Sequence, residues 1–128
     1  MINRRGIDHV TLTVSDINQT KEFYDSLFQT KFEKDNENSF CLLSVDIPVW
    51  FVQSEKQHPK DRFDETRVGL DHISFHLEAL EELEKFVTRL KEMGIMTAGV
   101  QRFAGKYPYV CFRDPDNIQT EFFISQEL

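Results

Sequence analysis

Residues 6–11 and 69–74 carry one pattern twice: Gly6-Ile7-Asp8-His9-Val10-Thr11 and Gly69-Leu70-Asp71-His72-Ile73-Ser74. The match continues at the same spacing into later positions, where Phe23 corresponds to Phe86. A repeat of about half the chain predicts two copies of one supersecondary unit, each too small to bury a good core alone. Each copy places a histidine at the same point of its first strand, so two copies packed face to face would bring His9 and His72 together.

The composition is that of a single globular domain. The chain has 128 residues, of which 40% are hydrophobic, and its formal net charge is −7. The negative charge disfavours nucleic acid, which requires a basic surface. No apolar run is long enough to span a membrane, and the N-terminus lacks the apolar stretch of an export signal, so we expect a cytoplasmic protein with no membrane partner. Cys41 and Cys111 lie in strand-like runs and are predicted to be buried free thiols.

Periodicity predicts the same order of elements in each copy. Residues 7–14 alternate as a half-buried strand with Val10, Leu12 and Val14 toward the core, and Ser15 or Asp16 caps a helix over about 18–28. Short strands near 31–33, 40–45 and 49–52 follow, with turns at 34–38 and 46–48.

The second copy is predicted to have a strand at 70–77, a helix at about 80–93, and strands near 96–101, 109–113 and 120–125. Gly94 ends this helix, and residues 114–117 form a turn. The polar stretch 54–68 is either a solvated linker or a flap over a site. We therefore predict an α+β fold, a single domain of two paired βαβββ modules forming a cupped mixed sheet. We call residues 6–53 the N-terminal module, 54–68 the connecting segment and 69–125 the C-terminal module.

The histidines and one carboxylate suggest a metal centre. Glu121 alternates onto the same face as His72 among apolar and aromatic neighbours, where a bare carboxylate would be costly. Each histidine alone would fit an ordinary hydrogen-bonded residue, and Glu121 alone would fit an exposed edge strand. The duplication favours a shared role: two histidines and a carboxylate suit Fe, Mn, Ni, Co or Zn and leave coordination positions open for substrate. His76, four residues after His72 on the same face, either hydrogen-bonds a metal ligand, acts as a general base or lies at the rim of the site.

These residues resemble the vicinal oxygen chelate superfamily, also called the glyoxalase/bleomycin resistance/dioxygenase family. The resemblance covers residues 6–125 and is carried by residues 8–16 with Phe23-Tyr24, by residues 70–75, and by residues 112–122. It implies paired βαβββ modules around one divalent metal held by His9, His72 and Glu121, with Glu121 also catalytic. It further implies a homodimer and a small substrate that chelates the metal through vicinal oxygens. In this family the modules that form one site belong either to one chain or, often, to different chains, and the sequence leaves both arrangements open.

Comparison with the subfamilies narrows these expectations. Glyoxalase I has a fourth ligand, a Glu on the last strand of the N-terminal module, where this chain has Val49-Trp50-Phe51-Val52. Thr11 and Trp50 resemble the fosfomycin-modifying thiol transferases, which implies a thiol cosubstrate, but the basic segment that those enzymes carry after the Glu is not present in residues 122–128. Extradiol dioxygenases favour a Tyr where this chain has Cys111.

Three functions therefore remain open. The first is a metal-dependent lyase, isomerase or transferase in which Thr11, Trp50, Tyr109 and Arg102 line the substrate pocket and His76 assists Glu121 in catalysis. The second is an Fe(II) ring-cleaving dioxygenase. The third is a binding protein without chemistry, as in the bleomycin-resistance branch, whose members generally lack the metal ligands that this chain retains.

Overall fold

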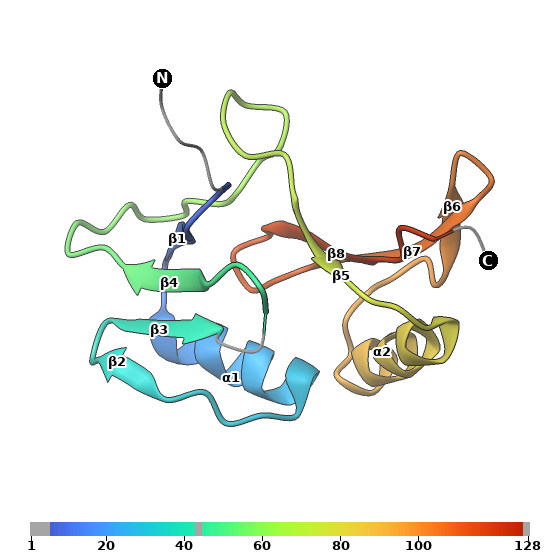
Figure 1. Cartoon of the computed structure of the whole chain (residues 1–128). Helices are drawn as coiled ribbons and strands as arrows, with labels where there is room; N and C mark the ends of the chain where they lie inside the picture. The colour runs from blue at the N-terminus through green and yellow to red at the C-terminus, as the bar shows by residue number, and fades with distance from the viewer. Residues whose placement is uncertain (1–5, 43–44, 127–128) are drawn as a thin grey trace, which may run out of the picture.

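The computed structural model describes residues 6–42 and 45–126, and it contains two four-stranded sheets with one helix each (Figure 1). The first sheet has the order β1-β4-β3-β2, and the second has the order β5-β8-β7-β6. β1 runs parallel to β4, and β5 runs parallel to β8. The other neighbouring strands in both sheets are antiparallel. The predicted α+β fold of two repeated βαβββ units is confirmed. The elements are β1 (Val10–Val14), α1 (Ile17–Phe28), β2 (Lys34–Asn36), β3 (Ser39–Leu42), β4 (Val49–Gln53), β5 (Ile73–His76), α2 (Leu80–Glu92), β6 (Gln101–Phe103), β7 (Tyr107–Arg113) and β8 (Gln119–Phe123).

The helix boundaries follow from local capping. Asp16 is the N-cap of α1, and its carboxylate accepts hydrogen bonds from the backbone N–H groups of Asn18 and Gln19. Gly94 follows α2 with a φ of +73°, a left-handed conformation that glycine adopts without a steric penalty. Both helices therefore begin and end within about two residues of their predicted limits.

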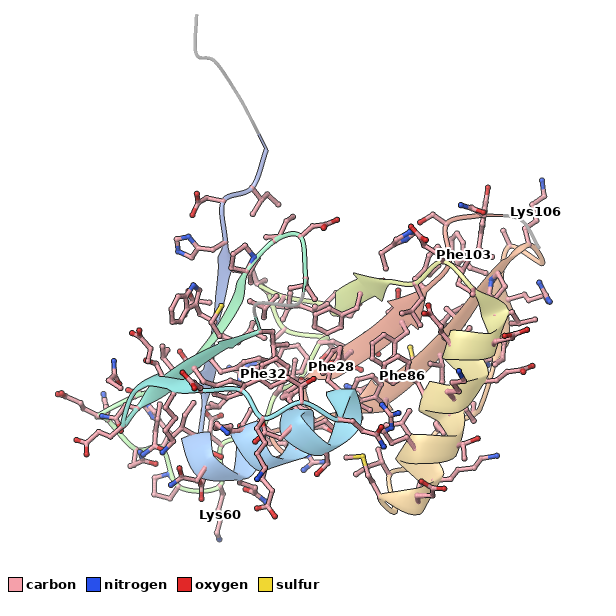
Figure 2. All side chains as sticks on the ribbon, turned by 60° about the horizontal axis from the view of Figure 1, so that its bottom comes forward. Phe28, Phe32, Lys60, Phe86, Phe103 and Lys106 are labelled. Atoms are coloured by element: carbon pink, nitrogen blue, oxygen red, sulfur yellow. The ribbon has the colours of Figure 1, made fainter. Side chains whose placement is uncertain are left out.

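The core lies between each sheet and its helix and continues across the junction of the modules. Phe28, near the end of α1, contacts Phe75, Phe86 and Phe122 of the C-terminal module edge-to-face, with ring centroids 5.6–5.9 Å apart. Figure 2 shows Phe28 lying between Phe32 and Phe86, where the two helices approach each other. Such aromatic pairs add about 0.5–1.5 kcal/mol each beyond their area burial, so this cluster holds the modules together.

Two of the predicted strands lie a few residues later in the structure. The predicted strand at 31–33 is β2 at Lys34–Asn36, inside the predicted turn, and the predicted strand at 96–101 is β6 at Gln101–Phe103. The predicted strand at 40–45 corresponds to β3 at Ser39–Leu42, and residues 43–44 lie outside the described residues. β2 and β6 are both exposed sheet-edge strands, so neither has a buried face that would leave an alternating pattern in the sequence.

Among the described residues, neither helix has the length and apolar character needed to cross a bilayer.

Candidate metal centre

His72 and Glu121 meet on the open face of the C-terminal sheet, away from α2. β8 alternates: Gln119, Glu121 and Phe123 are half-buried on this face, whereas the residues between them are fully buried against the helix. His72 immediately precedes β5, the strand paired with β8, and its Nε2 lies 3.5 Å from Glu121 Oε1. The side chains are 41% and 13% exposed, so a ligand can reach the pair from solvent.

The spacing of these donors fits a shared metal ion. Two donors about 2.1 Å from one tetrahedral metal lie roughly 3.4 Å apart. The Nε2–Oε1 separation of 3.5 Å therefore suits one ion, with an imidazole nitrogen and a carboxylate oxygen as ligands.

His9 lies apart from this pair in the single chain. It precedes β1 in the other sheet, and its side chain is 53% exposed. Within residues 6–42 and 45–126, no three His, Cys, Asp or Glu residues form a group that could hold a metal. A single copy of the chain thus brings together His72 and Glu121, two of the three predicted ligands, and leaves His9 on a separate surface.

The strand pairings show which residue the N-terminal module has at the position equivalent to Glu121. Thr11 of β1 pairs with Trp50 of β4, and the repeat-equivalent Ser74 of β5 pairs with Glu121 of β8. Trp50 is therefore the N-terminal counterpart of Glu121, and it has no metal-binding atom. On the next strand, Cys41 pairs with Trp50 just as Cys111 pairs with Glu121.

Both cysteines are free thiols at equivalent positions of the two modules. Cys41 is buried as predicted, but Cys111 is only half-buried because its strand presents it to the open face. Cys111 Sγ lies 3.5 Å from Glu121 Oε2. Desolvation, aided by the neighbouring Glu121 carboxylate, raises the pKa of Cys111 to about 11, so it remains a protonated donor to that carboxylate.

The other predicted site residues are distributed over both sheets. Thr11 is exposed and Trp50 half-buried in the first sheet, on the face that carries His9. Tyr109 lies on the open face of the second sheet, opposite Phe123, and His76 pairs with Phe123 from the other side.

Arg102 lies on β6, the strand at the far edge of the second sheet. It pairs with Pro108, whereas its neighbours Gln101 and Phe103 pair with Tyr109 and Tyr107. Successive strand residues alternate between faces, so Arg102 projects to the side opposite Tyr109. The structure does not bring it to the open face with His72 and Glu121.

The sequence interpretation missed two features of the open face. The first is an aromatic group beside Glu121, in which Phe103, Tyr107 and Tyr109 all contact Phe123 with ring centroids 6.1–6.2 Å apart. The second is a polar group around His72, in which Asp71 contacts the imidazole and Gln119 contacts Asp71. The repeated Asp-His pair and the alternation of β8 were visible signals, but the contacts depend on strand register.

Comparison with known proteins agrees with this architecture. The family model of the Glyoxalase/Bleomycin resistance protein/Dioxygenase superfamily matches residues 6–122. The fosfomycin resistance protein FosX of Listeria innocua is 26% identical over 122 residues, covering 88% of this chain and 84% of the relative. The metallothiol transferase FosB of Bacillus licheniformis is 26% identical over 118 residues, covering 91% of this chain and 73% of the relative.

The solved structures show the same fold. A glyoxylase/bleomycin resistance protein/dioxygenase domain from Frankia superposes with a TM-score of 0.80 at 27% identity, covering 95% of this chain and 98% of that one. With a family model spanning nearly the whole length, the chain belongs to the Glyoxalase/Bleomycin resistance protein/Dioxygenase superfamily.

Proposed function

We propose that this protein is a metal-dependent enzyme of the superfamily that acts on a small substrate chelating the metal through vicinal oxygens. The observation that carries the proposal is the His72–Glu121 pair, with donor atoms 3.5 Å apart on an accessible face. One relative is named a metallothiol transferase, which supports a metal-dependent activity. Ni, Mn, Co, Zn and Fe all accept this combination of imidazole and carboxylate.

The complete site requires two copies of the chain. His9 is the third ligand, and it reaches the His72–Glu121 pair from a second copy in a homodimer. β1 and β5, which follow the two histidines, are both edge strands in the described sheets. Their unpaired backbone groups are available to a second chain, and pairing of β1 with the β5 of another copy would bring the histidines together.

The substrate then binds between two different walls. Thr11 and Trp50 contribute a hydroxyl and a large ring from the N-terminal module of one copy. Tyr109 contributes a phenol from the C-terminal module of the other, within the aromatic group around Phe123. A pocket with one aromatic wall and a few polar groups is suited to a small oxygen-rich molecule.

Each residue has a distinct task in this site. The bound metal supplies Lewis acidity toward the substrate oxygens. Glu121 holds the ion with one carboxylate oxygen and accepts a hydrogen bond from the Cys111 thiol with the other. His76, exposed and two residues beyond Ser74 on the same face of β5, moves a proton to or from the substrate.

The relatives suggest the reaction class. FosX is named for fosfomycin resistance and FosB for metallothiol transfer. We therefore place this chain with the lyase, isomerase and transferase branch, with a thiol cosubstrate to be tested. An iron-bound form would instead favour ring cleavage, and a form that binds no metal would favour a binding protein.

Metal analysis of protein purified without chelator tests the proposal. We expect about one divalent ion per chain in the wild type and its loss in His72→Ala, because one neutral imidazole ligand is removed. His58→Ala is the matched control, since His58 is exposed on the connecting segment and should leave the metal content unchanged. The proposal fails if His72→Ala, shown to be folded by circular dichroism, retains metal like the control.

The identity of the ion directs the activity assay. Nickel, manganese, cobalt or zinc would lead to epoxides with thiols and to hemithioacetals, whereas iron would lead to catechols with oxygen uptake. Absence of metal, with no binding on reconstitution, would overturn the enzyme proposal.

A further inference from the structure

A continuous set of polar contacts runs behind His72, on the side away from Glu121. His72 Nδ1 lies 2.7 Å from Asp71 Oδ1. The side-chain amide of Gln119 donates to the same Asp71 oxygen at 3.1 Å and to the Asp71 backbone carbonyl at 3.2 Å. Asp71 is thus fixed by a neighbouring strand while it holds the imidazole. A carboxylate accepts hydrogen bonds, so the tautomer that satisfies this contact has its proton on Nδ1 and leaves Nε2 able to bind a metal.

Gln119 is itself oriented by an arginine. Arg113 Nη2 donates to Gln119 Oε1 at 3.2 Å, which settles which end of the amide faces Asp71. The same guanidinium makes a bidentate pair with Glu65, with both N–O distances at 2.8 Å. The pKa of Glu65 is lowered to about 2 by this hydrogen bonding, so the pair stays charged at neutral pH.

The N-terminal module has no such support. His9 Nδ1 lies 2.6 Å from Asp8 Oδ1, but the Asp8 side chain is 94% exposed. Among the described residues, no second side chain donates to Asp8. The ladder registers explain the difference, because the residue before the Val10–Val49 pair is Pro48, whereas the residue before the Ile73–Thr120 pair is Gln119. Proline has no side-chain donor.

We propose that Gln119, oriented by Arg113, is a positioning residue that fixes the tautomer and ring orientation of His72 through Asp71. The inference rests on the proposed metal site. It adds that the two histidine ligands differ in how firmly their imidazole rings are held before a metal binds. Both aspartates are exposed, but Asp71 is held by Gln119, whereas no second side chain among the described residues donates to Asp8. Outer-shell partners of this kind change metal affinity by roughly 10–100-fold when they are removed.

The first test examines His72 without metal. Imidazole ¹⁵N chemical shifts are recorded for the metal-free protein at mildly alkaline pH, and they report which ring nitrogen carries the proton. We expect His72 of the wild type to carry its proton on Nδ1 and expect Gln119→Met to give a mixture of tautomers. His9 is the internal reference in the same spectrum and should not change. Gln101→Met is the matched control, since Gln101 lies on the same face and makes no contact with Asp71.

A second variant tests the orientation by Arg113. Arg113→Met leaves Gln119 in place but removes the donor to its Oε1, so the amide can rotate away from Asp71. We expect the His72 tautomer to shift in the same direction as in Gln119→Met. An unchanged His72 spectrum in both folded variants would overturn the positioning role, whatever the protein binds.

The second measurement is the affinity for added Zn²⁺ by competition with a chromogenic chelator. We expect Gln119→Met to weaken binding roughly tenfold or more, while Gln101→Met binds as the wild type does. A shifted tautomer with unchanged affinity would overturn the link from positioning to metal binding. Failure of even the wild type to bind Zn²⁺ would overturn the proposed function and leave the tautomer result standing.

Discussion

Asp114 is a buried carboxyl group in the turn between β7 and β8. It is 6% exposed and accepts hydrogen bonds from the backbone N–H groups of Asp116 and Ile118 and from the Tyr24 hydroxyl. Burial raises the pKa of Asp114 from 3.8 to about 6, because desolvation outweighs these hydrogen bonds. The folded protein therefore holds the Asp114 proton more tightly than the unfolded chain does.

This shift makes stability depend on pH. The contribution of Asp114 is fully present below its unfolded pKa and is lost as pH rises through about 6. We expect the free energy of unfolding of the wild type, relative to that of Asp114→Asn, to rise by up to about 3 kcal/mol when the pH falls from 7 to below 4. The size follows from the pKa shift, because one pKa unit corresponds to about 1.36 kcal/mol. Urea unfolding of both proteins across this range measures the difference, and a constant difference would contradict the assignment.

Single residues differ in how far the sequence determines their role. His9, His72 and Glu121 could be singled out because strand alternation assigns a face from the sequence alone. Arg102 could not be placed, since the strand that carries it, β6, was predicted several residues too early. The Asp71–Gln119 contact joins residues 48 positions apart and depends on which residues two strands pair, and the sequence does not specify this.

At the scale of elements, the polar composition of the connecting segment did not determine where the segment lies on the fold. Its composition predicted a solvated linker or a flap. In the structure the segment contacts the turn between β7 and β8. The Phe63 N–H donates to Asp116 O at 3.0 Å, and the Asn117 side-chain amide donates to Phe63 O at 3.0 Å. Arg62 in turn donates to Asn117 Oδ1 at 2.9 Å. Polar contacts of this kind leave no periodic signal, whereas helices and buried strands do.

Asn117 is the point at which this docking can be tested. Its φ is +69°, so Asn117→Gly preserves the turn and removes both side-chain contacts with the connecting segment. We expect trypsin to cut the variant several-fold faster after Lys60 and Arg62, with a free energy of unfolding changed by less than about 1 kcal/mol. Limited proteolysis with mass analysis of the fragments measures the effect. Equal cleavage rates in variant and wild type would show that these contacts do not hold the segment.

At the scale of the whole molecule, the modules are joined on one side and open on the other. Phe28 and the rings around it join the helical sides, while β1 and β5 remain separate edges of two sheets. This arrangement leaves His9 away from His72 in one chain, and the internal repeat alone did not reveal it. A repeat predicts that two modules pair, but not whether they pair within a chain or between chains.

Mixing two defective chains distinguishes these cases. His9→Ala and His72→Ala each lose a ligand, and each alone should bind no metal tightly. In a heterodimer with sites between chains, intact His72 and Glu121 of the first variant meet intact His9 of the second, while the other site lacks both histidines. Random pairing makes half of the dimers mixed, so about a quarter of all sites should bind metal after the two proteins are refolded together. Sites built within one chain would remain defective in every mixture, so metal content no higher than in the separate variants would exclude the shared site.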